Sequence, residues 1–287
     1  FSDAPVLGSE RDDRSANFSR CRIERNRADH SAGVLKIRAG RSLFHNTIVA
    51  NNSANTNAIF YGFDADISFV ADSTITLNHV RSSKGVGTLY CGAALLDHSS
   101  VTLNRAHLDY SGLDLHGTTL AVKNSVVDSN VAGRNYGPMA LQAYSACAQG
   151  KKRPWLLVED SFLTNNRVGE QQSGYDGVLH GREMTSTILR NTTISGNYAG
   201  HSRAIGSLTY GNVLIQYCQI YSNMAYWDYS GFHFMANPTT IVNSTVRNNR
   251  AGRNYGPVYS ANYVCCDYEE VFPYLTVARS TFHANRV

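Results

Sequence analysis

Apolar residues recur at two fixed places ahead of a repeated asparagine. One stands eight residues before the asparagine, as Leu96 does, and another stands three residues before it, as Val101 does. The positions between them are polar or mixed, and many are β-branched. Such short segments predict β-strands whose side chains point alternately inward and outward, and helical periodicity does not fit them. The repeated asparagines are Asn26, Asn52, Asn78, Asn104, Asn130, Asn166, Asn197, Asn223, Asn249 and Asn285.

The spacing of these asparagines predicts the architecture. Most intervals are 26 residues, and the others are 36, 31 and 36 residues. One strong strand per 26 residues is too little for a propeller blade, but it suits a parallel β-solenoid, in which stacked coils bury a continuous core. We therefore expect an all-β parallel β-helix of about ten coils, forming one domain over residues 17–287 after a lead-in at residues 1–16.

The sequence also contains a repeat that is longer than one coil. Gly62–Val168 matches Gly181–Val287 without a gap, at an offset of 119 residues. Within it, "DYSG" at 109–112 returns at 228–231, and "AGRNYGP" at 132–138 returns at 251–257. Long loops on a rigid scaffold often carry function, although a long loop also needs turn residues and a Tyr that packs it down. Candidate partner contacts in these loops are Tyr110, Arg134, Asn135, Tyr136, Tyr229, Arg253, Asn254 and Tyr255.

The repeated asparagines have two structural interpretations. Their side-chain amides can stack up the axis as a ladder, each donating to the next. Alternatively, Asn is favoured at these turns because it tolerates left-handed backbone. The two interpretations are compatible.

The repeat as a whole resembles a known family. Its pattern of an aliphatic residue or Phe, two residues, Asn, one residue and Ala or Val is similar to the repeats of chlamydial polymorphic outer-membrane proteins and related extracellular, pectin-lyase-like β-helix proteins. This chain has "FHAN" at 282–285, and a loose Gly-Gly-Ala-aliphatic element in "CGAALL" at 91–96. Elsewhere Ile, Val or Leu replaces the Phe. The resemblance implies a right-handed coil and a secreted or surface-displayed protein, and it supplies no catalytic residues.

The charge and hydropathy of the sequence indicate which classes of partner to expect. The net charge is +4, and arginines such as Arg27, Arg105 and Arg167 recur at outward positions. They form either a solvated edge that guards against aggregation or a site for acidic glycans or an acidic partner. There is no aromatic and basic module typical of nucleic-acid binding, and no apolar run of about 18 residues for a membrane-spanning helix.

Modification sites are suggested by sequons and cysteines. Asn17, Asn51, Asn191 and Asn243 begin Asn-x-Ser/Thr sequons, which are glycan candidates if the protein is eukaryotic and secreted. Cys21 and Cys218 occupy an inward small position in distant coils, so we expect them to pack as small apolar residues rather than pair. The adjacent Cys265 and Cys266 suggest a strained vicinal disulfide, or a bond from one of them to a neighbouring chain.

The best cluster for catalysis is a charged row. Asp97, Lys123, Glu159 and Arg190 hold the same outward position in successive coils, about 5 Å apart. They make either a mixed-charge groove, as a polysaccharide lyase or hydrolase needs, or a row of weakly paired surface charges. His116 lacks a repeated acidic partner, because Met235 holds the duplicate position, and no histidine pair has convincing metal spacing. We expect neither a metal nor a cofactor.

These observations favour an extracellular or cell-surface structural or adhesive protein over an enzyme. Such a rod would self-associate, or bind glycan, through its repeated loops. A polysaccharide-active enzyme and a carbohydrate-binding β-helix are the alternatives. The final coil ends at Val287 with no capping segment, so we also expect further coils or end-to-end stacking of a second chain into a fibre.

Overall fold

A computed structural model describes most of the chain. The described residues are 6–8, 15–29, 34–55, 59–81, 86–90, 93–108, 112–116, 119–134, 137–142, 155–169, 177–182, 184–200, 205–209, 211–227, 231–235, 238–253, 256–261 and 274–287. They form short strands joined by bends. The described residues contain no helix long and apolar enough to cross a membrane.

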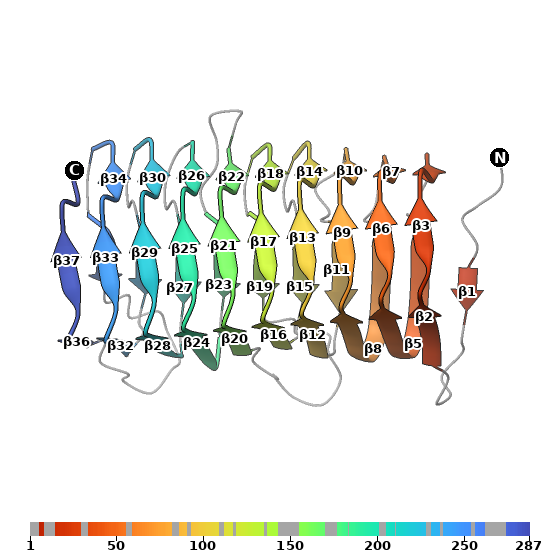
Figure 1. Cartoon of the computed structure of the whole chain (residues 1–287), viewed down its shortest axis with the longest axis horizontal. Coiled ribbons are helices and arrows are strands. Elements are labelled where there is room, and N and C mark those ends of the chain that lie inside the picture. The colour runs from red at the N-terminus through yellow and green to blue at the C-terminus, as the bar shows by residue number, and fades with distance from the viewer. Residues whose placement is uncertain are drawn as a thin grey trace.

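The strands stack in parallel along one axis, and the two ends of the chain lie at opposite ends of that axis (Figure 1). Each strand pairs with the equivalent strand of the next coil, as Val101 of one coil pairs with Val127 of the next. One flat side is a ten-stranded sheet. Its members are β3 (Arg22–Glu24), β6 (Ile48–Ala50), β9 (Thr74–Thr76), β13 (Ser100–Thr102), β17 (Val126–Asp128), β21 (Phe162–Thr164), β25 (Thr193–Ser195), β29 (Gln219–Tyr221), β33 (Thr245–Arg247) and β37 (Thr281–His283).

A narrower nine-stranded sheet follows the ten-stranded sheet in every turn except the last. It has two-residue strands: β4 (Arg27–Ala28), β7 (Ser53–Ala54), β10 (His79–Val80), β14 (Arg105–Ala106), β18 (Val131–Ala132), β22 (Arg167–Val168), β26 (Tyr198–Ala199), β30 (Met224–Ala225) and β34 (Arg250–Ala251).

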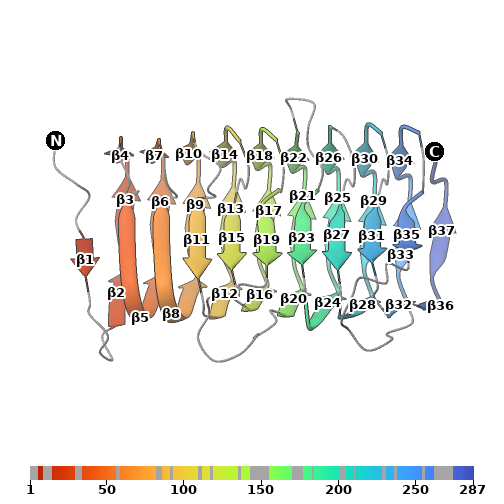
Figure 2. The same cartoon turned by 180° about the vertical axis from the view of Figure 1, so that it is seen from behind.

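The remaining strands form an 18-stranded sheet with two rows, joined by the long strands β5 (Leu35–His45) and β8 (Phe60–Ala71). The first row, seen from behind in Figure 2, adds β1 (Val6–Gly8), β11 (Gly87–Tyr90), β15 (Leu113–His116), β19 (Met139–Gln142), β23 (Leu179–Arg182), β27 (Gly206–Thr209), β31 (Phe232–Met235) and β35 (Val258–Ala261). The second row adds β2 (Ser15–Ser19), β12 (Ala93–Asp97), β16 (Thr119–Lys123), β20 (Trp155–Glu159), β24 (Ser186–Arg190), β28 (Asn212–Gln216), β32 (Thr239–Val242) and β36 (Leu275–Ala278).

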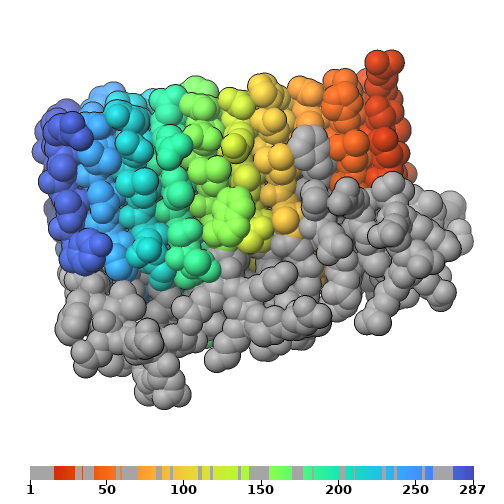
Figure 3. Space-filling view, turned by 90° about the horizontal axis from the view of Figure 1, so that it is seen from below, coloured from red at the N-terminus to blue at the C-terminus, as the bar shows by residue number. Residues whose placement is uncertain are grey.

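The predicted all-β parallel solenoid is confirmed, with a smaller regular part than expected. Six consecutive turns, from β11–β14 to β31–β34, have four separate strands. The first turn also has four separate strands, β1 to β4, whereas in the next two turns β5 and β8 fuse two strands into one, and the last turn has only β35, β36 and β37. The expected number of about ten coils therefore counts turns that lack the full set of strands. Figure 3 shows the turns as successive bands along the rod.

Both predicted apolar positions point into the core. Leu96 and Val101 are buried, and so is the small Ala106 two residues after the ladder asparagine of that coil. The last turn differs, because its inward residues Val277 and Phe282 are 46% and 39% exposed. The apolar side of that turn is therefore uncovered in this chain.

Two residues per turn adopt left-handed backbone. One precedes the inward Ser, Thr or Cys, as Asn191 does with φ 45°, and the other precedes the ladder asparagine, as Leu77 does with φ 55°. The ladder asparagines themselves are not among the described residues with positive φ. The interpretation that they are tolerated for left-handed backbone is therefore wrong, because the residue before each of them carries that conformation.

Candidate functional site

The repeated asparagines form one continuous ladder from Asn26 to Asn285. In a typical rung, the Asn104 Nδ2 donates to Asn130 Oδ1 at 3.0 Å and to the carbonyl of Ile75 at 2.9 Å. The Asn104 backbone N–H also donates to Asn130 Oδ1, at 3.1 Å. The same side-chain bonds join the remaining rungs. Because each amide bonds to the next coil, these asparagines hold the stack together and do not form a ligand site.

The inward Ser, Thr and Cys residues form a second internal row. Ser73 Oγ accepts from the Thr47 N–H at 3.0 Å and donates to the Ala71 carbonyl at 2.6 Å. Cys218 stands in the same row as a buried free thiol, and burial raises its pKa to about 11. Cys21, also free, is half-buried. Cys265 and Cys266 lie outside the described residues.

The charged row is assembled as predicted in register, and its charges pair with one another. Glu159 lies between Lys123, at 3.5 Å from Nζ to Oε2, and Arg190, at 3.0 Å from Nη1 to Oε1. Asp97 pairs in register with Lys123 and accepts a hydrogen bond from Asn124 Nδ2 at 3.1 Å. The arrangement supports the alternative of weak surface pairing, because both carboxylates are partly exposed and already have polar partners.

The two repeated loops can be compared at their arginines. The Arg134 N–H donates to the Leu108 carbonyl at 2.6 Å, and the Arg253 N–H donates to the Trp227 carbonyl at the same distance. Both arginines are exposed, and the Arg253 guanidinium lies over the Trp227 ring, 3.5 Å from its centroid. Tyr110, Asn135, Tyr136, Tyr229, Asn254 and Tyr255 lie outside the described residues. Equivalence of the two loop tyrosines thus stays a prediction.

The sequons lie on the outer surface. Asn17, Asn51 and Asn191 are exposed, and Asn243 is half-buried. Asn191 and Asn243 occupy the same left-handed corner two coils apart, and Asn191 Nδ2 donates to Asp160 Oδ1 at 2.6 Å.

A buried polar row on the first row of strands was not predicted. Thr88, Asp114, His180, Ser207 and His233 hold the outward position of β11, β15, β23, β27 and β31, in one register column. All five are buried, Asp114 being 1% exposed. The first row is thus buried on both of its faces along these turns.

Asp114 of this row pairs with His116, which follows it in β15. His116 Nε2 lies 3.0 Å from each Asp114 carboxylate oxygen. The Tyr90 ring stacks on the imidazole, with centroids 4.6 Å apart and planes 7° apart. The expectation that His116 has no repeated acidic partner stands, but the sequence analysis missed Asp114, which lies two residues earlier in the same strand. The signal was "LDLH" itself, since residues i and i+2 of a strand share a face.

The chemistry open to this pair is limited by burial. A carboxylate beside an imidazole can orient it and can support proton transfer. However, Asp114 is closed to solvent, and the His116 side chain is only 16% exposed. Within the described part of the chain, no group of three His, Cys, Asp or Glu residues could hold a metal ion.

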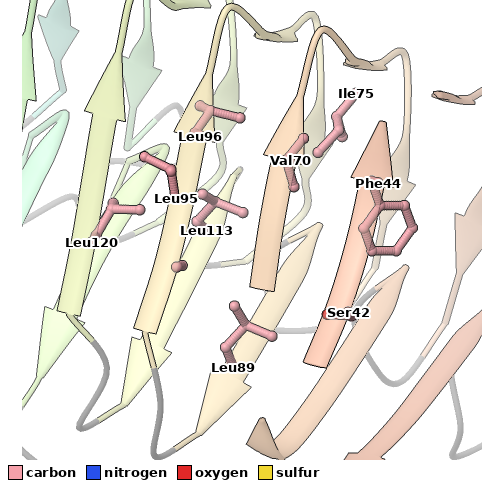
Figure 4. A pocket seen from close by; sticks show the side chains of 10 residues that line it. Ser42, Phe44, Val70, Ile75, Leu89, Leu95, Leu96, Leu113 and Leu120 are labelled. Atoms are coloured by element: carbon pink, nitrogen blue, oxygen red, sulfur yellow. The ribbon is translucent and has the colours of Figure 1, made fainter. Parts of the chain in front are cut away.

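The described part of the interior holds an apolar pocket. Phe44, Leu89, Leu96, Leu113 and Leu120 line it, with Ser42 at its edge (Figure 4). Its lining belongs to the stacked core, so it is a packing gap of the solenoid rather than a reaction site.

Comparisons with protein-family models, curated proteins and solved structures gave no match. The stacking of the strands defines the chain as a parallel β-solenoid. Its resemblance to a family rests on the sequence repeats alone.

Proposed function

We propose that this chain is a structural or adhesive protein, a stiff rod that presents repeated contact surfaces and self-associates. The observation that carries the proposal is the repeated corner at Arg134 and Arg253. Both place an exposed arginine beside the same backbone hydrogen bond, at an offset of 119 residues. Four coils separate them, which corresponds to about 19 Å along the rod.

The internal bonding suits a rigid support. Each ladder asparagine donates to the asparagine of the next coil, and inward serines such as Ser73 and Ser99 accept a backbone N–H from the preceding coil. On the second row of strands, charged side chains pair between coils instead of converging on a cleft. Repeat scaffolds of this kind keep fixed distances between surface features, as a fibre or coat requires.

The arginine corners have the chemistry of interface anchors. Arg and Trp are the residues that most often dominate binding energy at protein interfaces, and Arg253 lies directly over Trp227. A second copy of the chain is the partner proposed here, and assembly of copies would extend the rod into a fibre.

Sedimentation velocity over a range of protein concentrations tests this self-association. We expect larger species to grow with concentration, and we expect the double variant Arg134→Ala/Arg253→Ala to lose them. Arg22→Ala is the control, because Arg22 is exposed but is paired with Glu24 at 2.9 Å. A monomer at every concentration, or a double variant that assembles like the parent, would contradict the proposal.

An extracellular or cell-surface location is part of the proposal, and the resemblance to polymorphic outer-membrane repeats supports it. The exposed positions of Asn17, Asn51 and Asn191 leave room for glycans outside the core. Expression through a secretory pathway, followed by mass measurement before and after glycan removal, tests the sequons. Unmodified asparagines at all four positions would remove glycosylation from the proposal.

A polysaccharide-active enzyme is a second candidate function. The contact between Asp114 and His116 favours it, because it is an acid–base pair on a strand face. The charged row supplies weaker support, since Glu159 is engaged by two cations.

A further inference from the structure

The charged row on the second row of strands has an order that complements its own reverse. Its members from β12 to β24 are Asp97, Lys123, Glu159 and Arg190, in one register column. The sign of the charge alternates along the row and the number of charges is even. Reversing the row therefore exchanges every negative position for a positive one. Two neutral residues, Ala71 and Gln216, hold the next positions at its two ends.

The charged row stands at the surface. Lys123 and Arg190 are 41% and 44% exposed, and both carboxylates are partly exposed. Within the chain, Glu159 contacts the two cations of the neighbouring turns, and Asp97 lies 3.0 Å from His98 Nδ1. A second charged row laid against this one would bring an opposite charge to each group and exclude water, which strengthens the attraction between charges.

An apolar column runs beside the charged row on the same face. Leu95, Ala121, Leu157 and Ile188 stand two residues before the charged residues, and residues i and i+2 of a strand share a face. The two leucines and the isoleucine are half-buried. Figure 3 views the rod from the side at which the second row lies in Figure 1, and the described turns form adjoining bands there.

An exposed tryptophan lies near the middle of this face. Trp155 begins β20, two residues before Leu157, and it is 40% exposed. Tryptophans near the centre of a contact surface are frequent anchors of protein interfaces. The face thus combines alternating charge, aliphatic side chains and an aromatic anchor.

We propose that two copies of the chain associate through this face as antiparallel rods, related by a two-fold axis that crosses the rod between β16 and β20. This arrangement sets Lys123 of each copy opposite Glu159 of the other, and Asp97 of each copy opposite Arg190 of the other. It also lays the two apolar columns against each other. Parallel rods would instead keep the order of the charges, so that each charge lies level with its own equivalent.

The size of the face predicts a reversible dimer. The six turns from β8 to β28 span about 29 Å, and a strand of five residues spans about 17 Å. The contact would cover about 500 Å² on each copy, or about 1,000 Å² in total, which is slightly below the size of stable interfaces. We therefore expect dimers in the micromolar range of concentration.

This inference goes beyond the proposed function, whose contacts are the corners at Arg134 and Arg253. A two-fold interface is closed, so it stops at a dimer. The corners of each dimer would then join it to others. The corner variant Arg134→Ala/Arg253→Ala should therefore lose the larger assemblies and keep the dimer.

Reversal of the central charges tests the interface, with sedimentation velocity of the corner variant as the measurement. Lys123→Glu sets two negative charges opposite each other twice in each dimer, and Glu159→Lys does the same with positive charges. Each substitution should weaken dimerisation at least about tenfold. Arg22→Glu is the matched control, because it changes the net charge equally on β3 of the ten-stranded sheet. It should dimerise like the corner variant.

An equal mixture of the two reversed chains separates the interface from effects within one chain. In a dimer of one Lys123→Glu copy and one Glu159→Lys copy, every position of the row again faces an opposite charge. The mixture should therefore recover the dimer that neither chain forms alone. Thermal melting of each chain checks the fold. The chains are produced without glycans, because the sequon at Asn191 directly follows Arg190.

Three results would overturn the inference: a corner variant that is monomeric at every concentration, reversed chains that dimerise like Arg22→Glu, or a mixture without recovery. Loss of the dimer in both reversed chains and its recovery in the mixture would uphold it. The parent chain separates this inference from the proposed function. A parent that stops at the dimer upholds this interface and contradicts assembly through the corners. Larger parent assemblies with a monomeric corner variant uphold the corners alone.

Discussion

The backbone of Gly112 lies against the carbonyl group of Pro138, so closely that a Cβ at position 112 would overlap the Pro138 oxygen. Gly231 has the same relationship to Pro257, 119 residues later. Gly112 ends the first "DYSG", and Pro138 ends the first "AGRNYGP". The two fragments that occur twice in the sequence are therefore in contact at their last residues in each copy. The close packing of successive turns explains why both fragments are repeated.

Alanine at either glycine should destabilise the protein. Gly112→Ala or Gly231→Ala forces two turns apart, and overpacking of this kind costs about 1–3 kcal/mol. Gly256→Ala is a matched control inside the second "AGRNYGP", because a Cβ there meets no atom of the described residues within 4 Å. Urea unfolding should show loss of stability in the first two variants only. Equal midpoints for all three would contradict the contact between turns.

The asparagine ladder should contribute most to the free energy of unfolding in the middle of the rod. Asn104→Ala removes two donated bonds and leaves the amide groups of Asn78 without their acceptor. Buried groups left unsatisfied cost about 1–3 kcal/mol each. Asn285→Ala, at the last rung, disturbs only one neighbouring turn. We expect a larger fall in unfolding free energy for Asn104→Ala, and a larger fall for Asn285→Ala would argue against a cooperative ladder.

Leu77 should be replaceable with a gain in stability. Its φ of 55° is unfavourable for leucine, whereas Asn51 holds the equivalent place one turn earlier with φ 54°. Leu77→Asn should stabilise the chain by about 0.5–1 kcal/mol, since asparagine tolerates the left-handed region. Leu77→Ala removes the exposed apolar side chain without that relief. Melting temperatures that rank alanine above asparagine would contradict the explanation.

Cys218 should give a pH dependence above neutrality. The thiol has a pKa near 9 when unfolded, and burial raises the folded pKa to about 11. The folded state therefore holds its proton more tightly, so this contribution is complete below pH 9 and is lost as the pH rises toward 11.

Cys218→Ser provides the control, because Ser73 and Ser244 occupy the same inward row naturally. The variant should lose less stability than the parent between pH 9 and 11. The thiol itself should react with iodoacetamide at pH 8 more slowly than half-buried Cys21. Fast alkylation of Cys218 in the folded chain would contradict its burial.

The sequence predicted the stacking of the coils but missed the contact between Asp114 and His116, and there are physical reasons for both outcomes. Inward positions such as Leu96 and Val101 repeat because each turn buries the same stripe, so periodicity reveals them. Asp114 and His116 do not repeat, and their contact lies within one strand. The burial of Asp114 depends on what covers the outward face of the first row, which a repeat pattern does not encode. Charges such as Glu159 were placed correctly in register, but their pairing required side-chain geometry.

Polymer length after incubation tests most directly whether the rod is a scaffold. The purified chain would be mixed with polygalacturonate and heparin at pH 5–8, and the polymer size distribution would be measured. We predict no change in polymer length at any pH. Shortening of either polymer by the parent chain, lost in Asp114→Asn but kept in Arg190→Gln, would contradict the scaffold function and assign an enzyme to the Asp114–His116 pair.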